Sequence, residues 1–358
     1  MTPPTTIAAA FSHTQSATVQ KNLKDKLGRP LHDLRISVID RCNFRCTYCM
    51  PAEHYHESYT FLDKKEWLTF DEIERLARLF VKLGVSKIRI TGGEPLLREN
   101  LPTLFKKLAS VGSVSDLALT TNGIHLPKLA EPLKNAGLQR ITVSLDTLDE
   151  KIFKKMNGGK GSVKQVLEGI HAAEKAGFSQ MKINAVIQQG VNDQSPIGLV
   201  RHFRGTGHIV RFIEYMDVGN RNHWQPGLVV PSREIVAAIT REFPMKPLGP
   251  NYAGEVAERY GFEDGKGEVG FISSITQPFC GTCSRARIST DGKFYLCLFS
   301  SVGFDLREPL RSGASDEEMV KLIQNIWQNR GDRYSEERSS LLSLHAKAKK
   351  IEMYQIGG

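Results

Sequence analysis

The chain is poor in cysteine, in tryptophan and in long apolar runs. It has six cysteines and three tryptophans in 358 residues. No segment approaches the roughly 20 consecutive apolar residues of a membrane helix, so no membrane partner is expected. Residues 1–21 have neither the basic start nor the apolar core of a secretory signal, and we expect a flexible N-terminal tail. Disulfides would require an oxidising compartment, which nothing in the sequence indicates, so we expect reduced thiols and a cytoplasmic location.

The balance of charge narrows the class of partner. The chain has 48 Lys and Arg against 39 Asp and Glu, a net charge of +9. This excess favours an anion, either a nucleic acid or a phosphorylated small molecule. A basic iron-sulfur or zinc module that binds RNA would need exposed aromatic residues interleaved with Lys and Arg. The sequence has no such stripe, so this remains an alternative and no nucleic-acid partner is expected.

Three of the cysteines, Cys42, Cys46 and Cys49, fall in one C-x3-C-x2-C run. A four-iron cube normally takes four thiolates, so three cysteines leave one iron open to another ligand. S-adenosylmethionine can fill that position, and its reductive cleavage gives a radical that no side chain supplies. A zinc site would need a fourth nearby ligand. We therefore rank zinc, and plain structural cysteines, below a cluster. The run resembles the signature of the radical S-adenosylmethionine superfamily.

The other three cysteines form a second group of the same kind. Cys280 and Cys283 are three residues apart, and Cys297 follows. This group is also one thiolate short of closing a four-iron cube. Two incomplete sets of ligands predict two [4Fe-4S] clusters, each with an open iron.

Residues 34–216 alternate short β-branched runs with amphipathic stretches, which is typical of strand-helix units and a parallel sheet. The expected strands are Leu34–Asp40, Lys87–Thr91, Asp116–Thr121, Arg140–Asp146, Met181–Ile187 and His208–Met216. Six units are too few for a closed eight-stranded barrel. We predict an α/β fold with an incomplete (β/α)6 TIM-like barrel over residues 22–245. A C-terminal α+β segment over residues 246–358 would carry the second cluster and cover the barrel opening.

Two helices and one hairpin are marked by local signals. Thr69 with Glu72, and Ser315 with Glu318, form capping boxes before apolar stripes of helical period. The turn residues over 263–266 indicate a hairpin.

Several predicted strands carry polar residues where a doubly covered parallel sheet should be apolar. Lys87 and Arg89 share one face of the second strand, Lys182 and Asn184 share one face of the fifth, and Arg211 lies within the sixth. Buried cations without an anionic partner are costly, and a polyphosphate would satisfy them. Salt bridges or solvated strand ends are the alternative for any single residue. The agreement of three strands favours an anion site.

The strand ends carry further candidates. Thr91-Gly92-Gly93-Glu94-Pro95 follows the second strand, and Ser144 and Asp146 follow the fourth. The two glycines let the backbone approach a ligand closely. Active sites of barrel enzymes gather at this carboxyl edge.

With these residues placed, the chain resembles the GTP 3',8-cyclase family of molybdenum-cofactor biosynthesis, the MoaA family, from about residue 24 to residue 358. The most specific parts lie over residues 34–51, 211–219 and 280–297, and in the terminal Gly357-Gly358. The resemblance implies a lyase with two [4Fe-4S] clusters and S-adenosylmethionine as cofactors, and GTP as substrate.

The same resemblance implies roles for individual residues. Cys42, Cys46 and Cys49 would hold the cluster that cleaves S-adenosylmethionine, and Cys280, Cys283 and Cys297 would hold a second cluster whose open iron binds guanine. The implied cofactor residues are Tyr48, Gly92, Gly93, Glu94, Thr121, Ser144 and Met216. The implied GTP residues are Arg35, Lys87, Arg89, Thr120, Lys182, Asn184, Arg211, Arg285, Ala286 and Arg287. The implied catalytic residues are Arg35, Lys182, Gly357 and Gly358, the last two in a flexible tail that reaches the site.

The implied reaction takes hydrogen from C3' of GTP, joins C3' to C8 and reduces the resulting radical to (8S)-3',8-cyclo-7,8-dihydroguanosine 5'-triphosphate. A flavodoxin or ferredoxin would donate electrons, and a cyclic pyranopterin monophosphate synthase would receive the product. A monomer or homodimer is expected. The rival enzyme is another radical S-adenosylmethionine protein with an auxiliary cluster, although such relatives usually have more than six cysteines.

Overall fold

The computed structural model describes residues 23–252, 254–338 and 350–357, so the expected tail up to residue 21 and Gly358 lie outside the described residues. The strands are β1 (Asp33–Ser37), β2 (Lys87–Thr91), β3 (Asp116–Thr121), β4 (Arg140–Ser144), β5 (Lys182–Ile187), β6 (Ile209–Glu214), β7 (Met245–Leu248), β8 (Glu258–Phe262), β9 (Glu268–Ile272), β10 (Arg285–Ile288), β11 (Lys293–Tyr295) and β12 (Phe304–Asp305). They form one sheet in the order β12-β11-β10-β1-β2-β3-β4-β5-β6-β9-β8-β7.

All six predicted strands are present, and β2 and β3 have the predicted bounds. The predicted carboxyl ends of β1, β4 and β6 were two or three residues too long. Beyond β4 and β6, side-chain amides become hydrogen-bond partners of the backbone carbonyls, whereas after β1 the N–H of Val38 still donates to the carbonyl of Thr91 at 3.0 Å. Asn192 Nδ2 donates to the carbonyl of Asp146 at 2.9 Å, and Asn222 Nδ2 donates to that of Met216 at 3.0 Å. The chain therefore leaves the sheet at the edge where the site was expected.

Two strands from the C-terminal part extend the predicted six. β10 pairs parallel with β1, and β9 pairs parallel with β6, so eight strands run parallel from β10 to β9. β9 and β10 follow each other in sequence but lie at opposite ends of this run. Their connection, residues 273–284, therefore crosses the barrel opening and carries Cys280 and Cys283. The sheet is not closed, which confirms the incomplete barrel with a C-terminal segment across its opening.

The expected hairpin and the domain boundary both fall in this C-terminal part. β8 and β9 pair antiparallel around residues 263–267, which confirms the hairpin. β7 begins at Met245, and β7 and β8 continue the same hydrogen-bonded sheet. The division of the chain at residue 245 thus stays a prediction about domains.

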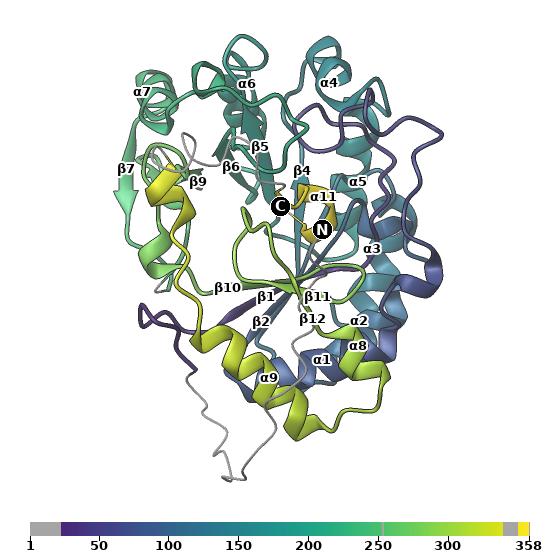
Figure 1. Ribbon diagram of the computed structural model, residues 1–358. Helices are drawn as coiled ribbons and strands as arrows, with labels where there is room; N and C mark the ends of the chain where they lie inside the picture. Colours follow the sequence, from purple (N-terminus) through teal and green to yellow (C-terminus); the bar gives the residue numbers. More distant parts are fainter. Residues whose placement is uncertain (1–22, 253, 339–349, 358) are drawn as a thin grey trace.

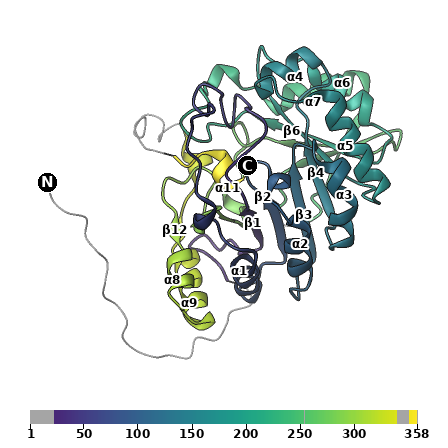
Figure 2. The same cartoon turned by 90° about the vertical axis from the view of Figure 1, so that its right-hand side faces the viewer.

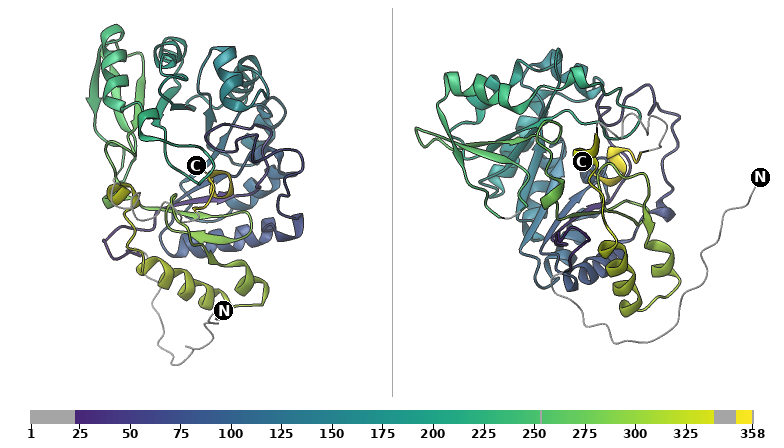
Figure 3. Two further views of the ribbon diagram at one scale, coloured as in Figure 1. Left: turned by 45° about the horizontal axis from the view of Figure 1, so that its top comes forward. Right: turned by 60° about the vertical axis from the view of Figure 1, so that its left-hand side comes forward.

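The longer helices cover the outer face of the curved sheet (Figure 1). They are α1 (Phe70–Lys82), α2 (Leu101–Ala109), α3 (Leu126–Asn135), α4 (Glu150–Asn157), α5 (Val163–Lys175), α6 (Ser195–Phe203), α7 (Ser232–Glu242), α8 (Arg307–Arg311) and α9 (Asp316–Gln328). Short 3-10 turns are η1 (Lys64–Glu66), η2 (Pro95–Leu97), η3 (Pro226–Leu228) and η4 (Cys280–Thr282). Both capping boxes are confirmed at α1 and α9, which pack against each other (Figure 3).

The C-terminal helix α11 (Met353–Ile356) lies on the other face of the sheet. Figure 2 places it opposite to α2 and α3, and it contacts β1. Tyr354 is buried there among the rings of Tyr55, Tyr59 and Phe61. Among the described residues, no helix combines the length and the apolar character that a membrane span needs.

Candidate active site

The first cysteine group lines a cavity of about 1080 Å³ at the carboxyl edge of the parallel strands. The loop that follows β1 brings Cys42, Cys46 and Cys49 to this cavity. The residues predicted to bind the cofactor all line the same space: Tyr48, Gly92, Gly93, Glu94, Thr121, Ser144 and Met216. The structure thus brings together the ends of four strands and the cysteine loop.

The cysteine loop is held in shape by its own backbone and by Arg45. The guanidinium of Arg45 donates to the carbonyls of Cys42 at 2.7 Å, Phe44 at 2.8 Å and Tyr55 at 2.7 Å. The N–H of Phe44 donates to Cys42 Sγ at 3.3 Å. The bonds of Arg45 fix the loop through backbone carbonyls, and the N–H of Phe44 is a donor to the sulfur of Cys42, as to a thiolate ligand of a cluster.

The thiols and their surroundings fit a cluster better than zinc. Burial raises the pKa of Cys42 to about 12 and also raises the pKa values of Cys46 and Cys49. Buried thiolates need compensating metal charge, and metal binding releases their protons. Among the described residues that line the cavity, none is a histidine. Its two carboxylates, those of Glu94 and Asp146, are already hydrogen-bonded, so a fourth protein ligand for zinc is lacking.

Glu94 fastens the end of β2 to the end of β3. Its carboxylate accepts hydrogen bonds from the N–H of Leu96 at 3.0 Å, from Thr121 Oγ1 at 2.7 Å and from the N–H of Asn122 at 2.7 Å. Burial raises the pKa of Glu94 to about 7. The Glu94 side chain therefore holds together the cavity wall at which it was predicted to bind the cofactor.

The glycine pair is required by a close crossing of two backbones. A Cβ on Gly93 would lie 2.3 Å from the carbonyl oxygen of Arg41, and one on Gly92 would lie 2.5 Å from that of Ile39. The N–H of Gly93 donates to the carbonyl of Ile39 at 2.7 Å. The sequence predicted that the two glycines let the backbone approach a ligand closely. In the structure they let it approach the backbone segment that leads from β1 into the cysteine loop.

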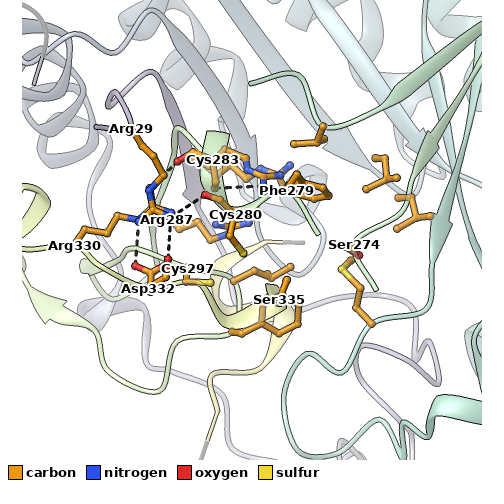
Figure 4. A pocket seen from close by; sticks show the side chains of 18 of the residues that line it. Arg29, Ser274, Phe279, Cys280, Cys283, Arg287, Cys297, Arg330, Asp332 and Ser335 are labelled. Carbon is orange, nitrogen blue, oxygen red and sulfur yellow. Dashed lines mark hydrogen bonds and ion pairs between the residues drawn. The ribbon is translucent and has the colours of Figure 1, made fainter. Parts of the chain in front are cut away.

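The second cysteine group lines another cavity, of about 780 Å³ (Figure 4). Cys280 and Cys283 lie on the connection between β9 and β10, and Cys297 follows β11. The arginines that share this cavity are Arg29, Arg35, Arg285, Arg287 and Arg330. Burial raises the pKa of Cys297 to about 12. Burial also raises that of Cys283, but the charges of Arg285 and Arg330 outweigh it and lower the pKa to about 6.

The two cavities adjoin. Asn184, Ile213 and Met216 line both of them. Asn184 Oδ1 is buried and has no hydrogen-bond partner among the described residues. A polar acceptor of this kind, placed between two sets of thiols, is suited to a ligand that reaches from one cavity to the other.

A dense group of cations begins in the second cavity and continues along the neighbouring strands. Arg287, Arg35 and Arg89 stand in register on the adjacent parallel strands β10, β1 and β2. Neighbouring strands are about 4.8 Å apart, so the three charges repel one another. Burial and the charges of Arg287, Arg285 and Arg89 hold the pKa of Arg35 well below its usual range. Burial together with Arg140 and Arg211 lowers the pKa of Arg89 to about 10.

Only part of this charge is compensated. Lys87 Nζ lies 3.4 Å from Asp33 and 3.5 Å from Asp116, and Arg211 lies 3.5 Å from Glu255. Lys87 and Arg211 therefore form salt bridges, which were the alternative to an anion site for any single residue.

Four other cations, Arg35, Arg89, Lys182 and Arg287, have no carboxylate within 4.0 Å in the part of the chain that the structure describes. Burial and the charges of Arg211 and Arg140 lower the pKa of Lys182 to about 6. An anionic ligand would relieve this surplus.

Two of the predicted site residues, Ala286 and Gly357, do not lie in the second cavity. Ala286 lies between Arg285 and Arg287, but its side chain is fully buried in the hydrophobic core, so the structure does not bring it to the cavity with them. A Cβ on Gly357 would lie 2.0 Å from Thr91 Cγ2, so the tail packs against a residue of the first cavity. Gly358 lies outside the described residues.

Sequence reasoning missed two residues of the site, Arg29 and Arg330, and the hydrogen bonds made by two residues at the strand ends. Asn122 Nδ2 donates to Asn43 Oδ1 at 2.7 Å, and Tyr48 donates its hydroxyl hydrogen to Asp146 at 2.8 Å. Asn122 directly follows the predicted third strand, and Asp146 ends the predicted fourth, so the position of each was a usable signal. Arg29 and Arg330 lie outside helices and strands, and no local pattern marks them.

Comparison with known proteins agrees with this geometry. The Radical SAM superfamily matches residues 36–203, and Molybdenum Cofactor Synthesis C matches residues 208–336. Among solved structures, methylornithine synthase superposes with a TM-score of 0.47 and 15% identity, covering 60% of this chain and 63% of that one.

Curated relatives are much closer. The chain is 52% identical to a GTP 3',8-cyclase of Xanthomonas campestris pv. campestris over 336 residues, covering 94% of this chain and 97% of the relative. It is 50% identical to that of Acidothermus cellulolyticus and 48% identical to that of Staphylococcus saprophyticus, covering 94% of this chain and 99% of each relative. The chain therefore belongs to the GTP 3',8-cyclase family of the radical S-adenosylmethionine superfamily.

Proposed function

We propose that this chain converts GTP to (8S)-3',8-cyclo-7,8-dihydroguanosine 5'-triphosphate in molybdenum-cofactor biosynthesis. One observation carries the proposal. Two groups of three thiols line adjoining cavities, and a surplus of buried cations lies beside the second. A nucleoside triphosphate has a base, a sugar and a polyanion, and the second thiol group, the shared wall and the cations offer a place for each.

The first cavity would hold a [4Fe-4S] cluster on Cys42, Cys46 and Cys49, together with S-adenosylmethionine. When bound, this pair supplies the 5'-deoxyadenosyl radical that takes hydrogen from C3' of GTP. The chain contributes the walls: the fixed cysteine loop, the strand ends tied together by Glu94, and Met216.

The cations would bind the triphosphate. Arg35, Arg89, Arg287 and Lys182 supply charge that has no acid partner among the described residues, so phosphate oxygens would gain charge-assisted hydrogen bonds. Lys87 and Arg211 contribute a weaker field because acids already face them. Thr120 and Thr142 each accept a hydrogen bond from Arg89 Nη1 at 3.0 Å and orient its guanidinium.

The second group would hold a further [4Fe-4S] cluster on Cys280, Cys283 and Cys297, whose open iron binds the guanine. Arg285 contacts Cys283 Sγ at 3.4 Å, and Arg287 lines the same cavity, so both would lie beside the base. The ribose would then lie at the shared wall of Asn184 and Met216. Arg35, Lys182 and the tail with Gly357 and Gly358 are the proposed catalytic residues.

Partners follow from the chemistry. Reductive cleavage needs an external one-electron donor such as a flavodoxin or ferredoxin, and the product would pass to a cyclic pyranopterin monophosphate synthase. All six cysteines are unpaired in the described structure, which suits a reducing cytoplasm.

The test is anaerobic reconstitution followed by turnover. We expect two four-iron clusters per chain and, with reductant, conversion of S-adenosylmethionine and GTP to 5'-deoxyadenosine and a cyclised nucleotide. Cys42→Ser should abolish formation of 5'-deoxyadenosine. Cys297→Ser should retain the first cluster but lose GTP binding. Turnover by Cys42→Ser, or an iron content of one cube in the unaltered chain, would contradict the proposal.

A further inference from the structure

Two buried arginines lie behind the second cysteine group. Arg29 is 2% exposed and Arg330 is 1% exposed, although they come from opposite ends of the chain. Asp25 joins them: its Oδ2 lies 2.5 Å from Arg29 Nε and 3.5 Å from Arg330 Nη1. Asp332 lies 3.2 Å from Arg330 Nε. Asp25, Arg29 and Arg330 are buried and Asp332 is partly exposed, so solvent screens the charges of the first three little.

Both guanidinium groups donate to the backbone of the cysteine loop. Arg29 Nη1 donates to the carbonyl of Cys280 at 2.9 Å, and Arg330 Nη1 donates to the carbonyl of Cys283 at 2.7 Å (Figure 4). The loop closes on itself through the N–H of Cys283, which donates to the carbonyl of Cys280 at 3.2 Å. Two cysteines of the group therefore take their backbone positions from these two arginines.

Arg29 also has one donor left over. Its Nη2 is buried and has no hydrogen-bond partner among the described residues, while the residue lines the cavity of the second group. A buried charged donor without an acceptor is unfavourable, so an acceptor is expected there. The sulfur atoms of an iron-sulfur cluster are acceptors, and hydrogen bonds to them and nearby positive charge tune its reduction potential.

We propose that Arg29 and Arg330 are positioning residues for the second cluster, and that Arg29 Nη2 donates a hydrogen bond to a cluster sulfur. The two arginines fix the loop that carries Cys280 and Cys283. Their charge favours the reduced cluster, which is one electron more negative. This inference rests on the proposed role of the second cysteine group.

The test measures the reduction potential of the second cluster by itself. A full-length chain in which Cys42, Cys46 and Cys49 are replaced by Ala holds only the second cluster, and a dye-mediated titration followed by electron paramagnetic resonance gives its potential. In this background, Arg29→Gln removes the charge, and Arg29→Lys keeps the charge without the forked donor. Arg204→Gln is the matched control, because Arg204 is a mostly buried, ion-paired arginine that lines neither cysteine cavity.

We expect Arg29→Gln to lower the reduction potential of the second cluster by at least about 59 mV. For one electron this is a tenfold shift of the equilibrium toward the oxidised cluster. Arg29→Lys should fall between Arg29→Gln and the parent, and Arg204→Gln should match the parent. Should Arg29→Gln fail to fold in thermal unfolding, the comparison of Arg29→Lys with the parent decides by the same measurement.

If the unaltered chain holds two four-iron clusters but the Arg29 variants show an unchanged reduction potential, this inference alone is overturned. An unaltered chain with one cube overturns the proposed function and this inference together.

Discussion

Replacing Lys182 by methionine should stabilise the protein without ligand and weaken its binding of GTP. Burial and neighbouring cations lower the pKa of Lys182 from 10.5 to about 6. The unfolded state therefore binds more protons than the folded state between pH 6 and pH 10.5, and the free energy of unfolding rises with pH through that window. Methionine fills a similar volume without the charge, so Lys182→Met should remove this part of the pH dependence.

The size of the effect follows from the same pKa. At about 1.4 kcal/mol for each pH unit, the lysine disfavours folding by up to about 5 kcal/mol at pH 7. Lys182 is partly accessible to solvent, which screens its neighbours, so we expect a gain of about 2 to 4 kcal/mol for Lys182→Met. Urea unfolding of the protein without clusters at pH 6, 7, 8 and 9 measures it. The exposed Lys151→Met is the matched control and should change stability by less than about 0.5 kcal/mol.

Ligand binding gives an independent check of the same reasoning. A triphosphate beside Lys182 would restore its charge, so GTP binding to the unaltered chain at pH 8 should take up nearly one proton. Titration calorimetry in buffers of different ionisation enthalpy measures that uptake. Lys182→Met should lose it and should bind GTP about 10- to 100-fold more weakly, because a hydrogen bond to a charged group contributes roughly 1.5 to 3 kcal/mol. A variant that is less stable than the parent at pH 7, or unchanged proton uptake, would refute the electrostatic argument.

Two further predictions concern the walls of the first cavity. Gly93→Ala places a Cβ 2.3 Å from the carbonyl oxygen of Arg41 and should lower the free energy of unfolding by about 2 to 4 kcal/mol, with loss of first-cluster iron. Gly198→Ala, which meets no atom within 4 Å in helix α6, is the control, and equal behaviour of the two variants would contradict the clash. Tyr354→Ala should detach the C-terminal segment, because the ring of Tyr354 anchors helix α11 among Tyr55, Tyr59 and Phe61. Hydrogen exchange of residues 350–357 would reveal the detachment, and unchanged protection there would count against it.

The sequence predicts the structure best for features that depend on residues close to one another in the chain. Both capping boxes and the bounds of β2 and β3 depend on residues within a few positions of one another, and the structure contains them. The predicted end of β4 was too long because Asn192, 46 residues further along the chain, donates to the backbone carbonyl of Asp146. Such a bond depends on the folded positions of two segments, and no periodicity reports it.

Residue types and their spacing were enough to indicate the kinds of ligand this protein can hold. The cysteine spacings set the number of metal ligands in each group, and cations placed in strands that should be apolar indicated an anion, because coordination number and the cost of burying charge depend on residue type alone.

The way in which these parts meet became visible in the folded chain alone. The parallel pairing of β10 with β1 and of β9 with β6 joins segments far apart in sequence, and it places Arg287 in register with Arg35. It also decides that Lys87 is neutralised by acids while Lys182 is not, and that Arg29 supports Cys280. These outcomes depend on strand register and long-range packing, which the local pattern of residues does not contain.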